Sequence, residues 1–178
     1  MKKITVIGSF SDPKELTKSI YTEEIDSERK ERLSARWWAS NYDTSVESKE
    51  ERKALLPSRL LIKKILSFGG HEVCMAHIDE DVDQVLEDGV FIFGDDVRLM
   101  RGKPNGCHEN SSALWDSNKD DLILMTGYAL SEDGMWRCHS WCVGVETGLV
   151  IETTELRVAY FGFALSPNEA AEFFRNNN

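Results

Sequence analysis

The spacing of apolar and polar residues divides the chain near residue 70 into a helical part and a part rich in strands. Residues 14–41 are highly charged, with scattered apolar positions that predict one or two helices with a solvated face. Residues 48–56 continue this pattern, and Pro57 is expected to open a further helix, whose broad apolar stripe ends at the glycine pair 69–70. An alternating segment at residues 3–7 predicts a short strand ahead of these helices.

After residue 70, short alternating segments separated by turn residues predict strands and a few short helices. The expected strands are 72–78, 90–93, 97–100, 121–130, 135–144, 149–154 and 157–164. The expected helices are 80–87, one that begins at Cys107, and 166–175, with Ser166 as its cap and Pro167 at its first position. The pattern predicts a single α+β domain over residues 1–178, with a mainly helical portion at 1–70 and a β-rich catalytic core at 71–178.

The charge balance and the length of the apolar runs restrict the class of protein. The 178 residues suffice for one domain, and 31 Asp and Glu against 21 Lys and Arg give a net charge of -10. This charge disfavours nucleic acid and anionic membranes as partners and mildly favours a cationic substrate or protein partner. No apolar run is long enough for a signal peptide or a membrane span. We therefore expect a cytoplasmic protein whose four cysteines are reduced thiols.

Cys107 is the best candidate for a nucleophile. It follows a loop of turn residues at 101–106 and precedes small and polar residues and then the sequence Ala-Leu-Trp at 113–115, which predicts that Cys107 begins a helix. The partial positive charge at a helix N-terminus favours the thiolate, which is the form that attacks carbonyl carbon. The neighbouring His108 is expected to be exposed on the first helical turn.

His139 is the imidazole expected to pair with Cys107. It lies in the alternating segment 135–144, in which successive side chains face opposite sides of a strand. If residue 144 pairs with residue 149 across the following turn, Glu152 lies on the His139 face as its diagonal neighbour and could orient the ring. A slip of one residue would turn Glu152 away, and Glu146 in the turn would be a poorer substitute.

A zinc site is the main alternative for the Cys and His side chains. Cys138 and Cys142 would share a strand face but lie about 13 Å apart at a rise of roughly 3.3 Å per residue, which is too far for one tetrahedral zinc. His139 would face away from both. We therefore expect neither a metal site nor a cofactor, and we expect Cys74, Cys138 and Cys142 to be packing residues.

The order Cys, His, acid, with the Cys at a helix start and the others on successive antiparallel strands, is the arrangement of papain-like and transglutaminase-like hydrolases. Five segments resemble motifs of a family of small bacterial and phage proteins with such a core. They are Cys-x-x-Asn at 107–110, Gly-Tyr-Ala at 127–129, His-x-Trp at 139–141, Val-Ile-Glu-x-Thr at 150–154 and Tyr-Phe-Gly at 160–162. The family has Asp at the position of Glu152 and commonly Ala at the position of Ser140. The resemblance implies a Cys-bearing helix packed on an antiparallel sheet, and it does not extend to residues 1–70.

Further site residues are expected around this triad. The backbone N–H of Cys107 would be one oxyanion donor, and the side chain of Asn105 a second, with Asn110 as an alternative. Both asparagines could instead cap the helix or the turn. Tyr128 and Trp141 are candidates for a substrate-binding wall, although both residue types also fill cores.

These residues predict a cysteine-dependent hydrolase or acyl transferase acting on an amide or thioester of a protein or peptide. Cys107 would attack the carbonyl carbon, His139 would serve as base and then acid, and Glu152 would orient the imidazole. Peptidases, isopeptidases, deamidases and transglutaminases share this arrangement, and the sequence does not choose among them. The alternative is a non-enzymatic accessory protein of a phage or bacterium that binds a host protein, with its partner surface in residues 1–70.

Overall fold

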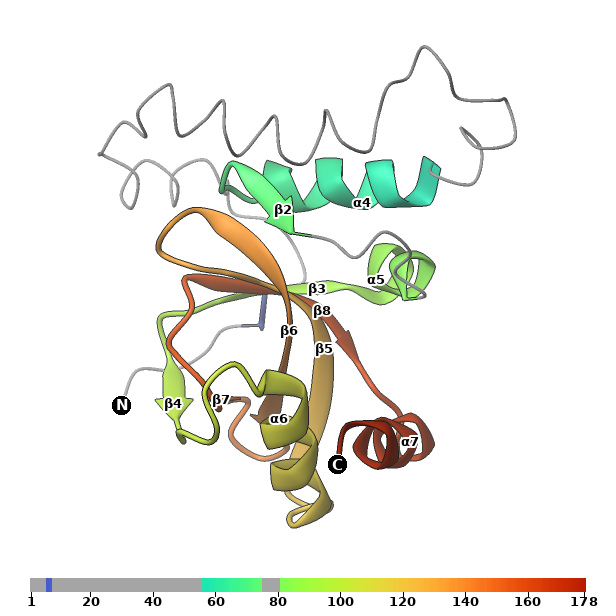
Figure 1. Ribbon diagram of the computed structural model, residues 1–178, viewed down its shortest axis with the longest axis vertical. Coiled ribbons are helices and arrows are strands. Elements are labelled where there is room, and N and C mark those ends of the chain that lie inside the picture. Colours follow the sequence, from blue (N-terminus) through green and yellow to red (C-terminus); the bar gives the residue numbers. More distant parts are fainter. Residues whose placement is uncertain (1–5, 8–55, 75–80) are drawn as a thin grey trace.

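The computed structural model describes residues 6–7, 56–74 and 81–178, which form four helices and eight strands (Figure 1). The helices are α4 (Leu56–Ser67), α5 (Val82–Asp88), α6 (Cys107–Asp116) and α7 (Pro167–Asn177). The strands are β1 (Val6–Ile7), β2 (Glu72–Cys74), β3 (Val90–Phe93), β4 (Val97–Leu99), β5 (Leu122–Leu130), β6 (Met135–Gly144), β7 (Val150–Glu152) and β8 (Ala159–Ala164). The described part of the chain is an α+β structure, as predicted.

The elements after residue 80 lie close to their predicted positions. β3 and β6 have the predicted bounds, and α6 begins at Cys107 as predicted. β7 is shorter than the predicted strand 149–154, because the backbone N–H groups of residues 153 and 154 donate to the Glu152 side chain. The predicted helices within 14–55, the strand residues 3–5 and the strand residues 75–78 lie outside the described residues.

The strands form one sheet in the order β1-β3-β8-β5-β6-β7-β4, and β2 joins it by pairing with β6. Pairing is antiparallel except between β2 and β6 and between β4 and β7. β8 lies beside β5 and not beside β7, the strand that precedes it in the chain. The long antiparallel pair of β5 and β6 therefore forms the middle of the sheet.

The sheet curls around one cluster of side chains on its inner face. Ile92 of β3 and Val97 of β4 come from opposite ends of the strand order, yet both pack in this cluster. Trp141 of β6 and Tyr160 of β8 fill its middle, with their ring centroids 5.0 Å apart. Residues 94–96 are the only link between β3 and β4, which brings the two ends of the curled sheet together.

All four helices pack on the opposite, outer face of the sheet (Figure 1). α4 and α5 pack in a cluster that contains Tyr128 and Trp136 of the two central strands. α6 and α7 pack farther along these strands, in a cluster that contains Leu124 and Cys142. None of the helices that the structure describes is long and apolar enough to cross a lipid bilayer.

Two helix ends follow directly from the local sequence. At the start of α7, the Ser166 hydroxyl accepts a hydrogen bond from the Glu169 N–H, the Glu169 carboxylate accepts one from the Ser166 N–H, and Pro167 occupies the first turn. This is the predicted cap. After α4, Gly70 has a φ of 76°, and a side chain there would approach Nε1 of Trp136 to 2.9 Å.

Candidate active site

The edge of β6 that faces away from β5 is only partly paired. β2 pairs with residues 135–137 on this edge and β7 with residues 142 and 143, because β5 occupies the other edge of the strand. Between these two ladders, residues 138–141 pair on this edge with no strand in the described part of the chain. His139 lies in this gap. Because no described strand covers this edge, a side chain on the outer face can contact the His139 side chain on the inner face.

The loop before α6 brings Cys107 to this gap. β4 runs parallel to β7, and the loop continues along the same neighbour with backbone hydrogen bonds of 2.8 Å to the carbonyls of residues 152 and 153. α6 then packs on the outer face of β6, where the Ser111 hydroxyl donates to the backbone carbonyl of Ser140 at 2.9 Å. The start of the helix is therefore fixed beside the gap by bonds at both ends of the loop.

Asn110 holds the loop in shape. Its side-chain oxygen accepts from the Lys103 N–H at 3.0 Å, and its amide group donates to the Lys103 carbonyl at 2.8 Å. Gly102 is needed beside it, because a Cβ at that residue would lie 2.4 Å from the Asn110 amide carbon. Asn110 therefore closes the turn of the loop, which leaves Asn105 as the remaining side-chain candidate for an oxyanion donor.

His139 and Glu152 form a buried hydrogen-bonded pair. Nε2 of His139 lies 2.8 Å from Oε2 of Glu152, and the two side chains are 2% and 0% exposed. β6 and β7 pair residue 142 with 151 and residue 143 with 150, which is the predicted register and confirms that the two residues share a face. Because Nε2 is occupied, Nδ1 is the ring nitrogen left for the hydrogen bond with Cys107.

The Glu152 carboxylate is held by four further hydrogen bonds. Oε1 accepts from the N–H groups of Thr153 and Thr154 at 2.8 Å each and from the Thr154 hydroxyl at 2.9 Å, and Oε2 accepts from the Tyr160 hydroxyl at 3.1 Å. Burial alone would raise the pKa of Glu152, but the bond to the imidazole, its charge and the Thr154 bonds lower it to about 2. The carboxylate is therefore ionised and fixed in orientation near neutral pH.

The thiol of Cys107 lies within hydrogen-bonding reach of two imidazoles, those of His108 and His139. Burial alone would raise the pKa of the thiol, but these two hydrogen bonds and the charges of the rings lower it to about 5. Burial lowers the pKa of His139, and its bonds to Cys107 and Glu152 raise it by more. The favoured state near neutral pH is a thiolate beside an imidazolium.

His108 is not exposed on the first helical turn, so that prediction was wrong. Its ring packs edge-on against Phe173 of α7 with centroids 5.7 Å apart, and its Nδ1 lies 2.7 Å from the Ser140 hydroxyl. Hydrogen bonds with Cys107 and Cys138 raise the pKa of His108 to about 10, against the lowering effect of burial. The local sequence carries no sign of this contact, because α7 comes from the far end of the chain.

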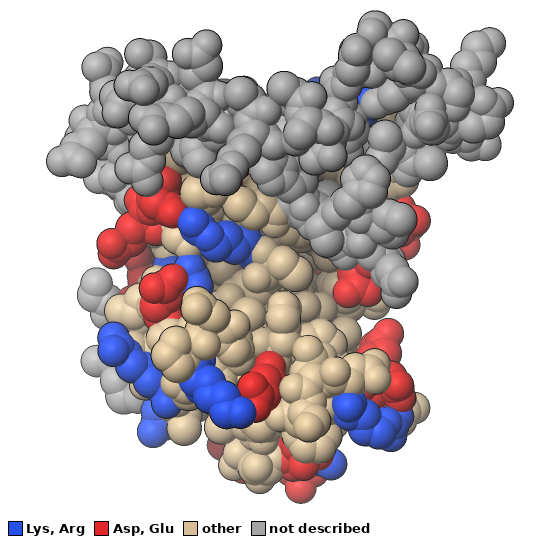
Figure 2. All heavy atoms as spheres, viewed as in Figure 1, with Lys and Arg blue, Asp and Glu red and all other residues tan. Residues whose placement is uncertain are grey.

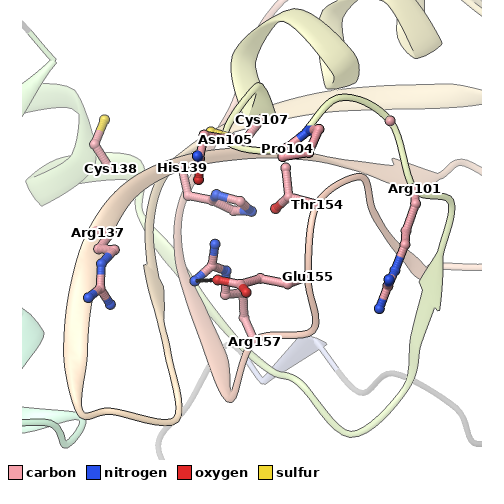
Figure 3. A pocket seen from close by; sticks show the side chains of 11 residues that line it. Arg101, Pro104, Asn105, Cys107, Arg137, Cys138, His139, Thr154, Glu155 and Arg157 are labelled. Atoms are coloured by element: carbon pink, nitrogen blue, oxygen red, sulfur yellow. Dashed lines mark ion pairs between the residues drawn. The ribbon is translucent and has the colours of Figure 1, made fainter.

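A pocket of ≈ 400 Å³ opens beside Cys107 and His139 (Figure 3). Its walls come from the loop before α6, from β6 and from the segment after β7. The lining residues are Arg101, Gly102, Pro104, Asn105, Cys107, Arg137, Cys138, His139, Thr154, Glu155 and Arg157. Asn105 has a φ of 60° and lies close to Cys107 in Figure 3. The structure therefore brings Asn105 to the nucleophile, and its role as oxyanion donor stays a prediction.

The charge of this pocket differs from that of the whole chain. Three arginines line it, with Glu155 as the acidic lining residue. Figure 2 shows Lys and Arg side chains, with some acidic ones among them, over the side of the molecule that carries β4 and the loop before α6. The expectation of a cationic substrate came from the net charge, and the pocket does not support it, because most of the acidic residues lie elsewhere.

Trp141 and Tyr128, the two predicted substrate-binding residues, are core residues. Trp141 is 0% exposed on the inner face and Tyr128 is 1% exposed on the outer face, and neither lines the pocket. Both lie on central strands that are covered on both faces, so their side chains cannot contact a substrate. Their placement corresponds to the core alternative, and the substrate-binding prediction is corrected.

The other cysteines differ in their surroundings, and all four cysteines are free thiols. Cys142 is buried, and burial raises its pKa to about 12, in agreement with a packing role. Cys138 is exposed and lines the pocket, so the expected packing role is wrong for this residue. It lies in the gap of β6 that pairs with no described strand on that edge, beside His108. No three His, Cys, Asp or Glu side chains of the described residues are grouped to hold a metal ion.

Two glycines, Gly127 and Gly162, lie close to His139 and were not identified from the sequence. Gly127 pairs with His139 across β5 and β6, and Gly127 also pairs with Gly162 across β5 and β8. A Cβ at Gly162 would lie 2.8 Å from the Trp141 ring, so the missing side chain makes room for the indole next to His139. A glycine within a strongly apolar strand would have been the sequence feature that predicts such close packing.

Comparisons of the chain with family models, with curated proteins and with solved structures find no match.

Proposed function

We propose that the protein is a cysteine-dependent hydrolase or acyl transferase that acts on an amide or thioester, with Cys107, His139 and Glu152 as its catalytic triad. The observation that carries this proposal is the buried His139–Glu152 hydrogen bond, whose histidine lines the same pocket as Cys107 at the start of α6. The interaction with His139 also contributes to the lowered pKa of the Cys107 thiol. A papain-like or transglutaminase-like core is part of the same proposal. The helix with its Cys on an antiparallel-rich sheet supports it.

In the proposed reaction, the Cys107 thiolate attacks the carbonyl carbon and the carbonyl oxygen becomes an oxyanion. The Cys107 N–H at the helix start and the Asn105 side chain would donate to that oxyanion. The His139 imidazolium then gives its proton to the leaving amine or thiol, and the C–N or C–S bond breaks to leave an acyl thioester on Cys107. Water or an amine, deprotonated by His139, attacks the thioester and regenerates the thiolate.

The first test is the pH dependence of iodoacetamide alkylation at each cysteine, followed by mass spectrometry. Cys107 should titrate near its pKa of about 5, whereas an ordinary thiol titrates near about 8.5. The small thiol 2-mercaptoethanol, treated in parallel, serves as the reference. His139→Ala should raise the Cys107 midpoint, because it removes a hydrogen bond and a positive charge from the thiolate.

The second test asks for the acyl intermediate. Wild-type protein exposed to 4-nitrophenyl acetate should acquire one acetyl group on Cys107 and then lose it, and His139→Ala should slow both steps. Failure of Cys107 to react faster than 2-mercaptoethanol at pH 6 in either experiment would contradict the proposal. That outcome would favour the non-enzymatic binding protein, whose expected surface in residues 1–70 lies largely outside the described residues.

A further inference from the structure

Arginine side chains from three different segments line the pocket beside Cys107. Arg101 comes from the loop before α6, Arg137 from β6 and Arg157 from the segment between β7 and β8. In the view of Figure 3 their guanidinium groups all lie below the His139 ring, around Glu155. Such a gathering of cations is unexpected in a chain with a net charge of -10.

Two of these arginines are already paired. Arg137 donates from both terminal nitrogens to the Asp133 carboxylate, at 2.9 and 2.6 Å. Arg157 forms an ion pair of 2.8 Å with Glu155 and a hydrogen bond with the Ser131 hydroxyl, and its side chain is only 10% exposed. Its Nε is nevertheless buried and has no hydrogen-bond partner in the described residues. A buried donor without a partner is costly unless a bound group satisfies it.

Arg101 is the cation of this pocket whose charge is not balanced. Its side chain forms no ion pair within the described part of the chain, whereas Arg137 and Arg157 each have a carboxylate partner. The guanidinium of Arg101 matches a singly charged planar group that accepts hydrogen bonds. A carboxylate has this charge and this geometry.

We propose that the pocket binds a substrate that carries a carboxylate close to the scissile bond, with Arg101 as its principal charge contact. This inference rests on the proposed function, because it takes Cys107 as the nucleophile. Two sources supply the same chemistry in a peptide, namely the C-terminal carboxylate and the side chain of Asp or Glu. Arg101 and Cys107 line the same pocket, so either carboxylate would bind in the pocket that holds the nucleophile.

The test compares two alkylating agents that differ in charge. Iodoacetate carries a carboxylate, and iodoacetamide is its neutral counterpart. The iodoacetate-to-iodoacetamide rate ratio at Cys107, divided by the same ratio for 2-mercaptoethanol, removes the effect of thiolate content. We expect this normalised ratio to be about five at low ionic strength, although the net charge of the chain repels anions. A normalised ratio at or below one overturns the inference.

Variants identify the residue responsible. Arg101→Gln should bring the normalised ratio close to one. Arg98→Gln is the matched control, because Arg98 is an exposed residue of β4, loses the same charge and does not line the pocket. Equal losses in the two variants would mean that only the long-range charge matters, which overturns the inference. Failure of the proposed function is separate, since it appears as a slow reaction of Cys107 with iodoacetamide itself.

Competition then distinguishes the two sources of the carboxylate. N-acetylglutamine offers the α-carboxylate, N-acetylglutamic acid α-amide offers the side-chain carboxylate, and N-acetylglutamine amide is the neutral control. Protection of Cys107 against iodoacetamide by the first compound indicates a C-terminal carboxylate, and protection by the second indicates an acidic side chain. Equal protection by all three, or protection by none at millimolar concentrations, counts against carboxylate recognition.

Discussion

The two histidines that bond to Cys107 approach it from opposite faces of the sheet. His139 lies on the inner face, 2% exposed, with a buried carboxylate 2.8 Å from its Nε2. His108 lies on the outer face, where the Ser140 hydroxyl is 2.7 Å from its Nδ1. Both rings lower the pKa of the same thiol, yet one has an anionic partner and the other a neutral one.

This difference separates the functions that the two rings can serve. The Glu152 carboxylate stabilises the charged form of His139 and fixes which nitrogen faces the thiol. His108 owes its raised pKa to the thiols of Cys107 and Cys138, so its positive charge depends on the anion that it stabilises. We infer that His139 carries protons during a reaction, whereas His108 strengthens the thiolate.

The most damaging change to the inner histidine should be Glu152→Gln. The variant removes a buried charge opposite an imidazolium, and we expect the free energy of unfolding at pH 7 to fall by about 3 kcal/mol. The pKa of Glu152 is about 2 in the folded protein, against a usual value of 4.5, so the carboxylate stabilises the fold above pH 4.5. The difference in the free energy of unfolding between wild type and variant should therefore shrink as the pH falls from 4.5 towards 2. Urea unfolding at pH 7 and pH 3 measures it.

Glu155→Gln is the matched control for that experiment. Glu155 lines the same pocket, but its side chain is 68% exposed, and exposed ion pairs contribute little to stability. We expect a change of less than about 1 kcal/mol at pH 7. A Glu152→Gln deficit no larger than that of Glu155→Gln would mean that the inner histidine has no special anionic partner.

The second change acts on the space around the inner histidine. Gly127 lies directly across from His139, and a Cβ there would approach the Phe161 carbonyl oxygen to 2.4 Å. Gly127→Ala should lower the free energy of unfolding by about 2 kcal/mol. It should also change the pKa of Cys107, because it displaces the neighbouring His139. Gly148→Ala is the control, since it meets open space and costs only about 1 kcal/mol through its φ of 63°.

The sequence predicted the inner half of the site and missed the outer half. Alternation along residues 135–144 placed His139, and the turn that follows was short enough to define the register that brings Glu152 to it. These are local relations within one hairpin. The contact of His108 with Phe173 joins the first turn of α6 to the last helix of the chain, and no periodicity in a sequence predicts which helices will be neighbours.

The pocket illustrates the same limit. Trp141 and Tyr128 were predicted as its wall because aromatic residues near a nucleophile suggest a binding surface, but central strands in a curled sheet are covered on both faces. The residues that do line the pocket include arginines of two loops, whose approach to one another follows from the parallel pairing of β4 with β7. That pairing joins residues 53 positions apart in the chain, and the sequence predicts each strand but not which strand it pairs with.

The third prediction compares the two histidines directly. His139→Ala and His108→Ala should each raise the pKa of Cys107 by about one unit, because each removes a hydrogen bond and a positive charge. Glu152→Gln acts only through His139, so its effect on the thiol should disappear in a His139→Ala background and persist in a His108→Ala background. Alkylation profiles of the two double variants measure this coupling. Equal persistence in both backgrounds would contradict the separation of roles.

The smallest expected effect belongs to Ser140→Ala. The buried Ser140 hydroxyl donates to Thr126 at 3.1 Å, so it accepts the Nδ1 proton of His108. Its loss should lower the free energy of unfolding by about 1 kcal/mol. Ser117→Ala, on an exposed hydroxyl at the end of α6, should change stability by less than about 0.5 kcal/mol.

Ser140→Ala should leave the Cys107 titration nearly unchanged, because a hydroxyl holds the outer ring in place without adding charge. Contact with Phe173 keeps that ring beside the thiol after the hydroxyl is gone. If the variant instead raises the pKa of Cys107 as much as His108→Ala does, the outer histidine depends on its hydroxyl as strongly as the inner one depends on its carboxylate. The distinction between a proton-carrying and a stabilising histidine would then have to be abandoned.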